Sequence, residues 1–371
     1  MKITAVKTYL VTHKLPKWLA NSYFTYDSRD ALLIKISTDE GLVGWGETAP
    51  MFGVRDIIDK KYAPVLIGQD PRNHRKLWRQ CWGVNFGNGM AMGGLDIALQ
   101  DLRGKVLNQS VSDMYGGRVR DKVEVYASSV NYSEGREPEE QYPADAVALV
   151  EQGYRGVKLR IGRFPLKREI PFIAAVREAI GPNVKLTVDV NGAYSLPRAI
   201  QMGRELQQLG VYWYEEPLPQ QHYAGYDVLT STLDIAVAGG ECVDSRFAAR
   251  ELILRRAVDI IQPDVSLCGG FAECLGIAEM SRMWNITCIP HCWGGALVTA
   301  ATIHLVSLLP DATSAYDCEA PLLELDVTEN PFRDKIVKQQ IEVRDGYIEV
   351  PKGPGLGIEI DEEALKHYAL D

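Results

Sequence analysis

The chain lacks any cluster of lysines and arginines, although it has 40 of these residues among 371. Its formal net charge is −9 at pH 7. Nucleic acids and anionic membrane surfaces are bound by basic patches or stripes. We therefore expect neither as a partner, and an anionic small molecule would need cations placed locally in its site.

Long hydrophobic runs and paired cysteines are also missing. No apolar run reaches the roughly 18 residues that suggest a membrane span, and residues 1–11 alternate like a strand instead of forming the apolar stretch of a signal peptide. The seven cysteines are an odd number and include no Cys-x-x-Cys pair. We expect reduced thiols packed in the core of a cytoplasmic protein.

What the sequence does contain is the composition of a folded protein, with 46% hydrophobic and 24% charged residues. Its length exceeds that of a usual single core, so two domains or a large barrel with a cap are expected. Residues 1–118 contain strand-like segments followed by helical patterns, which predicts an α+β cap domain. The strands are expected at 2–11, 31–38 and 43–47, and the helices at 54–66, 73–82 and 90–107.

Residues 119–326 alternate short β-rich runs with longer amphipathic stretches, as parallel βα units do. Eight such runs predict a barrel, because eight strands close around a filled interior. Residues 327–371 break the alternation, and we expect this segment to return to the cap. The eight runs are 123–129, 156–162, 184–191, 211–217, 235–241, 259–264, 286–292 and 313–319.

Polar residues capable of chemistry stand at the last positions of consecutive predicted strands. The carboxyl ends of barrel strands converge on one mouth, so these side chains are expected to meet there. From the second strand to the eighth they are Lys158 and Arg160, Asp189 and Asn191, Glu215, Glu241, Asp264, His291, and Glu319.

Three of these residues are carboxylates on adjacent strands. Asp189, Glu215 and Glu241 follow one another at intervals of 26 residues. Three hard oxygen donors around one point are suited to Mg²⁺, which leaves places for water or substrate oxygens. The alternative for any one of them is that it caps a helix or pairs with a cation of the barrel.

Lys158 and Arg160 are two residues apart, so a strand directs both side chains to the same face. They could simply form salt bridges with the carboxylates. As functional groups, Lys158 could bind a substrate carboxylate or transfer a proton, whereas Arg160 stays protonated and is suited to holding an oxyanion.

Asp264 and His291 end neighbouring predicted strands and are expected to form an acid/base dyad. The glycines after His291, in the sequence Pro-His-Cys-Trp-Gly-Gly, would allow a ligand to approach closely. Glu319 could exchange a hydrogen bond or a proton with a substrate oxygen. It could equally be a surface acid, and Glu324 is a competing candidate for its role.

Several separate motifs together resemble the enolase superfamily, and within it the mandelate racemase subgroup. The resemblance covers nearly the whole chain. The motifs are 94–99 with Asp101 and Lys105, Lys158-x-Arg160, Asp189-x-Asn191, the Trp-Tyr-Glu-Glu-Pro of 213–217, the Gly-Gly-Glu of 239–241, the Gln-Pro-Asp of 262–264, and Pro290-His291.

This resemblance implies a modified (β/α)₇β barrel of the TIM type, covered by a cap built from the N-terminal segment and the C-terminal tail. It also implies that Asp189, Glu215 and Glu241 bind Mg²⁺ and that Asp264 and His291 act as one acid/base. The shared reaction of the family removes the proton α to a carboxylate and stabilises the resulting enediolate. Racemisation, dehydration or cycloisomerisation then follows, depending on the member.

One position departs from the racemase pattern, which has a second lysine as base where this chain has Arg160. A two-base racemisation is therefore disfavoured. We expect a dehydratase of sugar acids that uses His291 as base and then as acid. A cycloisomerase or epimerase is the alternative, because residues 324–357 also resemble sugar-lactone cycloisomerases.

In this family, substrate choice is attributed to two cap loops, which correspond here to residues 15–29 and 49–55. Tyr23, Met51 and Phe52 lie in them and are candidate substrate contacts together with Asn191, although they could simply pack. The subgroup often forms homo-oligomers, so we expect one here. A remote alternative is a non-catalytic scaffold, whose expected sign would be the loss of a ligand or of the dyad.

Overall fold

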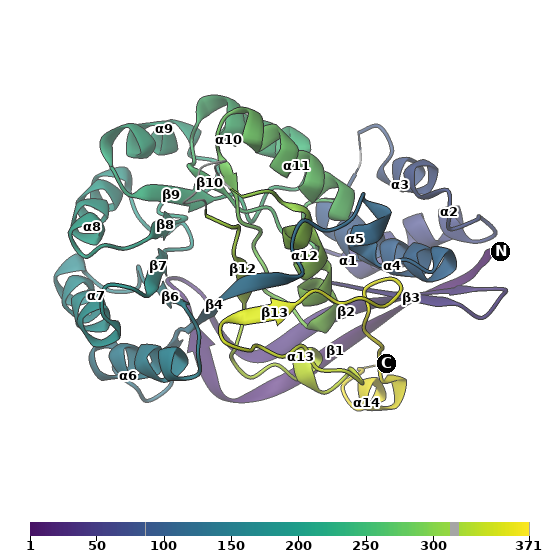
Figure 1. Cartoon of the computed structure of the whole chain (residues 1–371), viewed down its shortest axis with the longest axis horizontal. Helices are drawn as coiled ribbons and strands as arrows, with labels where there is room; N and C mark the ends of the chain where they lie inside the picture. The colour runs from purple at the N-terminus through teal and green to yellow at the C-terminus, as the bar shows by residue number, and fades with distance from the viewer. Residues whose placement is uncertain (86, 312–318, 371) are drawn as a thin grey trace.

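The computed structural model of the chain describes residues 1–85, 87–311 and 319–370. Two sheets organise it, one antiparallel and one mostly parallel. The parallel sheet curls, with helices around its outside, and the antiparallel sheet lies with the cap helices at one end of it (Figure 1). The barrel and cap predicted from the sequence are both present.

The cap sheet is built from a long antiparallel ribbon. Strand β1 (Ile3–Ala20) pairs with β2 (Thr25–Thr38), and β2 pairs with β3 (Val43–Thr48). The predicted strand 2–11 is therefore much longer, and most of segment 15–29, expected as a loop, is strand. Strand β5 (Tyr132–Ser133) adds two further residues to the end of β1.

Helices cover the cap sheet. The long helix α4 (Gly89–Leu107) packs directly on β3, where a Cβ at Gly46 would stand only 2.1 Å from the carbonyl oxygen of Gly94. Glycine in β3 thus permits the close approach of helix and strand. The other cap helices are α1 (Val54–Ile57), the π-helix η1 (Ile58–Tyr62), α2 (Ala63–Leu66), α3 (His74–Trp82) and α5 (Val111–Met114).

In the part of the chain that the structure describes, eight parallel strands form the barrel sheet, in the order β11-β10-β9-β8-β7-β6-β4-β12. Seven of them coincide with predicted runs. The eighth predicted run, 313–319, lies outside the described residues apart from Glu319, and the last described strand of the barrel sheet begins four residues later. The strands are β4 (Lys122–Val130), β6 (Gly156–Arg160), β7 (Lys185–Asp189), β8 (Trp213–Glu215), β9 (Ala236–Gly239), β10 (Ile260–Ile261), β11 (Thr287–Cys288) and β12 (Leu323–Leu325).

A helix follows each barrel strand from β4 to β11 and covers the outer face of the sheet, because the apolar stripes of the helices need a partner. Figure 1 shows α6 to α11 around the outside and α12 nearer the cap. The helices are α6 (Pro138–Glu151), α7 (Leu166–Ile180), α8 (Leu196–Gln208), α9 (Tyr223–Thr232), α10 (Arg246–Arg255), α11 (Phe271–Met283) and α12 (Ala296–Leu308).

The C-terminal segment contacts both parts of the molecule. As expected it reaches the cap, where Ala369 bridges to Val11 and the backbone N–H of Leu370 donates to the carbonyl of Leu10. It also extends the barrel sheet, because β13 (Tyr347–Glu349) pairs antiparallel with the start of β4. The short helices α13 (Pro331–Asp334) and α14 (Glu362–Lys366) complete this segment.

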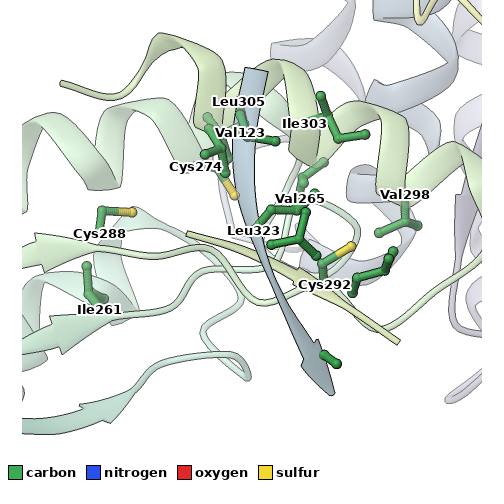
Figure 2. Packing of buried hydrophobic residues seen from close by; sticks show 14 of the residues in the cluster. Val123, Ile261, Val265, Cys274, Cys288, Cys292, Val298, Ile303, Leu305 and Leu323 are labelled. Carbon is green, nitrogen blue, oxygen red and sulfur yellow. The ribbon is translucent and has the colours of Figure 1, made fainter. Parts of the chain in front are cut away.

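The described cysteines other than Cys242 are buried and free, as expected of core thiols. Figure 2 shows Cys274, Cys288 and Cys292 among aliphatic side chains of the barrel strands and helices. Burial raises the pKa of the Cys292 thiol far above its ordinary value. Although it follows His291, Cys292 is a packing residue and not a nucleophile. Within the described part of the chain, every helix is too short or too polar to cross a membrane.

Candidate active site

Three carboxylates meet at the carboxyl ends of adjacent barrel strands. Asp189 ends β7 and Glu215 ends β8, in direct register with each other, and Glu241 follows β9. One ligand oxygen from each lies within 4.8 Å of the others. Asp189 and Glu215 are fully buried and are held by strands of the sheet, whereas Glu241 stands on the turn after β9.

The backbone turns sharply beside each of these carboxylates. Asn191 and Glu216 have positive φ values of 48° and 40°, and Gly240 has 111°. Left-handed backbone is uncommon for residues other than glycine and tends to be kept where function needs it. These turns end the strands and leave the carboxylates facing the mouth of the barrel.

Lys158 on β6 is buried among these acids. Its Nζ lies 2.8 Å from Oε1 of Glu215 and 3.7 Å from Oδ2 of Asp189, and it also pairs with Glu324. Burial alone would lower the pKa of Lys158, but the charges of Glu215 and Glu324 outweigh it and raise the pKa. Lys158 is therefore an ammonium ion in this arrangement and not a free base.

Arg160, two residues further along β6, is also directed to the mouth. It donates to Asp189, and its Nη1 is 3.4 Å from Oδ1 of Asn191. The guanidinium carbon lies 5.2 Å from the ring centre of Trp293, within cation–π range. These contacts fix a permanently charged, planar donor at the position where the racemase pattern has a lysine.

His291 and Asp264 form the expected dyad. Nδ1 of His291 is 2.7 Å from Oδ2 of Asp264, whose other oxygen accepts from the backbone N–H of Ser266 at 2.7 Å and from its hydroxyl at 2.6 Å. Nε2 of His291 is 3.5 Å from Glu241. Burial would lower the pKa of His291, but Glu241, Glu324 and Asp264 raise it to about 10.

Glu319 does not lie with this group, which corrects the expectation for the last strand. It is exposed and accepts a hydrogen bond from Tyr212, which precedes β8 and so stands at the opposite end of the barrel. The competing candidate, Glu324, is the residue on the last strand, β12, and it is buried. Lys158, His291 and Arg160 outweigh its burial and lower the pKa of Glu324 to about 2.

Two residues of this region were not expected from the sequence. Trp213 donates from Nε1 to Oε2 of Glu215 at 2.9 Å, and Gln262 donates to the same oxygen at 3.0 Å. The indole and the amide therefore orient Glu215 from one side while Lys158 binds its other oxygen. Two signals were available in the sequence, since both residues belong to predicted strands that carry site residues and both stand in motifs that carry the family resemblance.

A third unexpected residue comes from the cap. Glu47 on β3 is buried and accepts the backbone N–H of Gly295 at 2.5 Å, at the start of α12. Burial raises the pKa of Glu47 to about 7, although the backbone N–H groups of the helix start oppose the shift. Nothing in the local sequence reveals this carboxylate, because its partner is 248 residues away.

A cavity of about 530 Å³ opens over the dyad between the barrel mouth and the cap. Asn191, Met51, Arg160, Glu241 and His291 line it. Tyr23 and Phe52 are not among its lining residues, and they are 74% and 83% exposed. Of the four predicted substrate contacts, Asn191 and Met51 line this cavity, and their contact with a substrate stays a prediction.

The three carboxylates fit a divalent cation. Oε2 of Glu241 is buried and accepts no hydrogen bond from any described residue. Its nearest described cation is the imidazole of His291, with Nε2 at 3.5 Å. A buried carboxylate oxygen that lacks a hydrogen bond is costly, and a bound cation would supply a direct interaction. Hard oxygen ligands of this kind are those that Mg²⁺ and Mn²⁺ prefer.

Comparison with protein families supports the same arrangement. Residues 4–116 match the N-terminal domain of the mandelate racemase / muconate lactonizing enzyme family. Residues 141–364 match the enolase C-terminal domain-like family. The two matches together cover the cap and most of the barrel.

Individual relatives extend over the full chain. D-galactarolactone cycloisomerase of Agrobacterium fabrum is 35% identical over 380 residues, covering 100% of this chain and 99% of the relative. Arabinonate dehydratase of Saccharolobus solfataricus is 32% identical, with 92% and 95% covered. The crystal structure of 3,6-anhydro-D-galactonate cycloisomerase from Zobellia galactanivorans superimposes with a TM-score of 0.88 at 32% identity, with both chains fully covered.

Proposed function

Because the chain belongs to the mandelate racemase / muconate lactonizing enzyme family of the enolase superfamily, we propose that it dehydrates a sugar acid in a Mg²⁺-dependent reaction. The observation that carries this proposal is the single dyad. Among the described residues that line the cavity, His291 is the one imidazole, and Arg160 occupies the position of a second base. A single histidine is sufficient to remove an α-proton and then return it to a leaving hydroxyl.

Asp189, Glu215 and Glu241 would hold the ion. Bound Mg²⁺ supplies positive charge that stabilises the negative charge developing on the substrate carboxylate. Lys158 and Arg160, directed to the same point, add fixed positive charge from the protein. Their hydrogen bonds to Glu215 and Asp189 also hold those side chains in position.

His291 acts through Nε2, because its Nδ1 is bound to Asp264. The α-carbon–hydrogen bond breaks, the proton passes to Nε2, and the electron pair moves toward the carboxylate. When that pair returns, the bond to the β-hydroxyl breaks, and the proton on Nε2 leaves with it as water. Asp264 stabilises the imidazolium between the two steps. Glu324, beside Lys158, takes the role first assigned to Glu319, which is to exchange a hydrogen bond or a proton with a substrate oxygen.

The cavity is of a size that suits this substrate class. Its volume of about 530 Å³ lies within the usual range for small-molecule sites, about 300–1,000 Å³. Asn191 and Ser266 are polar groups of its lining that can hydrogen-bond to sugar hydroxyls. A sugar acid of five or six carbons is the substrate that we propose.

A cycloisomerase acting on a sugar lactone is the second candidate. It is favoured by the relative of Agrobacterium fabrum, which carries that name and matches the full length of this chain. Both reactions begin with the same proton abstraction, and they differ in the group that leaves. The two candidates therefore predict different products from one shared site.

The decisive experiment incubates the purified chain with Mg²⁺ in D₂O and a library of aldonates, aldarates and their lactones, followed by proton NMR. A dehydratase yields a 2-keto-3-deoxy acid, and a cycloisomerase yields a product of unchanged composition. His291→Asn is the matched control and should yield neither product nor α-proton exchange. Exchange at the full rate in that variant would refute the role given to His291, and turnover unaffected by a metal chelator would refute the Mg²⁺ requirement.

Two further properties are proposed beside the reaction. The six free cysteines of the described residues suit a reducing cytoplasm. Assembly into a homo-oligomer follows from the family alone, and light scattering on the purified chain would measure it. A monomeric mass would refute the second proposal without affecting the reaction.

A further inference from the structure

Glu216 is a buried acid that the reaction does not use. It directly follows Glu215, and its φ is positive, at 40°. It is 6% exposed, yet none of the residues that the structure describes forms a hydrogen bond or ion pair with its carboxylate. A carboxylate in so enclosed a position normally has such a partner, and a cation is one ligand that would complete its surroundings.

Two other potential ligands surround this carboxylate. Glu241 and Cys242, on the turn after β9, each place a ligand atom within 4.8 Å of that of Glu216 and of one another. Oε2 of Glu241 is the buried oxygen that also accepts no hydrogen bond from the described residues. Cys242 is the exposed cysteine among those described, so an ion can reach it from solvent.

The ligand types decide which ion would fit. A thiolate is a soft ligand, which Zn²⁺, Cd²⁺ and Co²⁺ accept and Mg²⁺ does not. Zinc binds sulfur at about 2.3 Å and carboxylate oxygen at about 2.0–2.2 Å in a tetrahedral arrangement, which places ligand atoms on one ion about 3.5 Å apart. The three ligand atoms lie within 4.8 Å of one another, so they would need to approach by up to about 1.3 Å to share an ion, a movement that rotation of the side chains provides.

We propose that Glu216, Glu241 and Cys242 form a second divalent-cation site, selective for thiophilic metals, that shares Glu241 with the carboxylates Asp189 and Glu215. On binding, the Cys242 S–H bond breaks, the sulfur–metal bond forms, and the proton is released to solvent. Glu241 belongs to both groups of ligands, so an ion bound to Glu216 and Cys242 competes for Glu241 with an ion bound to Asp189 and Glu215. The site does not depend on the identity of the reaction.

The test is a titration of the full chain, stripped of metal by a chelator and kept reduced by a phosphine, with Cd²⁺. Bonding of Cd²⁺ to a thiolate produces a charge-transfer absorption band in the near ultraviolet, which carboxylate ligands alone do not give. We expect one such band per chain, saturating at one equivalent. We expect no band in Cys242→Ser and at least a tenfold weaker affinity in Glu216→Gln.

Glu342→Gln, which alters an exposed glutamate elsewhere, is the matched control and should bind like the unchanged chain. Circular dichroism confirms that each variant is folded, and Glu216→Asp provides a second variant if Glu216→Gln is not. No band in the unchanged chain, or an equal band in Cys242→Ser, would overturn the site. An affinity unchanged in both Glu216 variants would remove Glu216 from it and overturn the proposal as stated.

Discussion

Nδ1 of His291 lies 2.7 Å from Oδ2 of Asp264, and the second oxygen of Asp264 is held by Ser266. This chain of hydrogen bonds fixes the imidazole ring so that Nε2 faces the cavity. General acid–base catalysis by a residue placed in this way is worth about 10²–10⁴ in rate. The dyad is therefore the part of the site whose removal is most informative.

Asp264→Asn is predicted to lower kcat/KM by about 10²-fold or more, because the asparagine no longer stabilises the imidazolium. The carboxylate of Asp264 raises the pKa of His291, so its loss lowers that pKa. Since the base must be neutral to accept a proton, the acidic limb of the kcat/KM profile moves to lower pH. Ser266→Ala, which removes one hydrogen bond to Asp264, should shift the limb less. A limb that stayed in place in Asp264→Asn would show that another group controls it.

Glu324 and Glu319 are predicted to differ sharply when each is changed to glutamine. Glu324→Gln removes a charge that pairs with Lys158 beside the dyad, so kcat should fall by about 10²-fold or more, the usual cost of losing one electrostatic contact to the reacting centre. Glu319→Gln changes only an exposed contact with Tyr212. Its steady-state kinetics should stay within about twofold of the unchanged enzyme. The reverse order of effects would restore the original assignment to Glu319.

The difference between these two glutamates also shows how far sequence reasoning reaches. Asp189, Glu215, Asp264 and His291 were predictable because each follows an apolar β-type run, and barrel strands bring such ends together. The run predicted for the last strand was 313–319, whereas the strand among the described residues is Leu323–Leu325, which begins two residues after Pro321. The sequence signal for Glu324 was that this acid stands between two leucines, Leu323 and Leu325.

Other features depend on contacts between distant parts of the chain. The pairing of Tyr347–Glu349 with the start of β4 adds an antiparallel strand that no local pattern predicts. The exposure of Tyr23 and Phe52 likewise depends on how the cap loops lie over the barrel, because aromatic residues pack or protrude according to tertiary context. Hydrophobic patterns and residue propensities identify helices, strands and the ends of strands. The pairing of β13 and the exposure of the two aromatic side chains instead depend on how distant parts of the chain pack together.

Glu47 is predicted to make stability fall as the pH rises. Burial raises its pKa from the model-peptide value of 4.5 to about 7. Between these two values the native state retains a proton that the unfolded state has lost, so stability present below pH 4.5 is lost as the pH rises through 7. The full effect is at most about 3 kcal/mol, since one unit corresponds to about 1.4 kcal/mol.

Urea unfolding of Glu47→Gln and of the unchanged chain from pH 4.5 to pH 8 measures this effect. The difference in stability between the two should change by up to about 3 kcal/mol in favour of the variant as the pH rises. Glu140→Gln, at an exposed position, should show no such trend. A constant difference for Glu47→Gln would mean that the carboxylate ionises in the native state as it does in the unfolded chain.

His304 is predicted to act in the opposite direction. It is fully buried on α12, with Nδ1 3.2 Å from the hydroxyl of Ser112 and Nε2 3.2 Å from the carbonyl of Leu356. Burial lowers the pKa of His304 to about 4, whereas the unfolded chain takes up the proton near 6.5. Stability present above pH 6.5 is therefore lost as the pH falls through 4, by about 2 kcal/mol at pH 5.

His304→Gln should remove this acid-dependent loss from the urea midpoint, and His367→Gln, at an exposed position, should leave it unchanged. If His304→Gln retained the full loss between pH 6.5 and 4, protonation of His304 would not be a cause of acid unfolding.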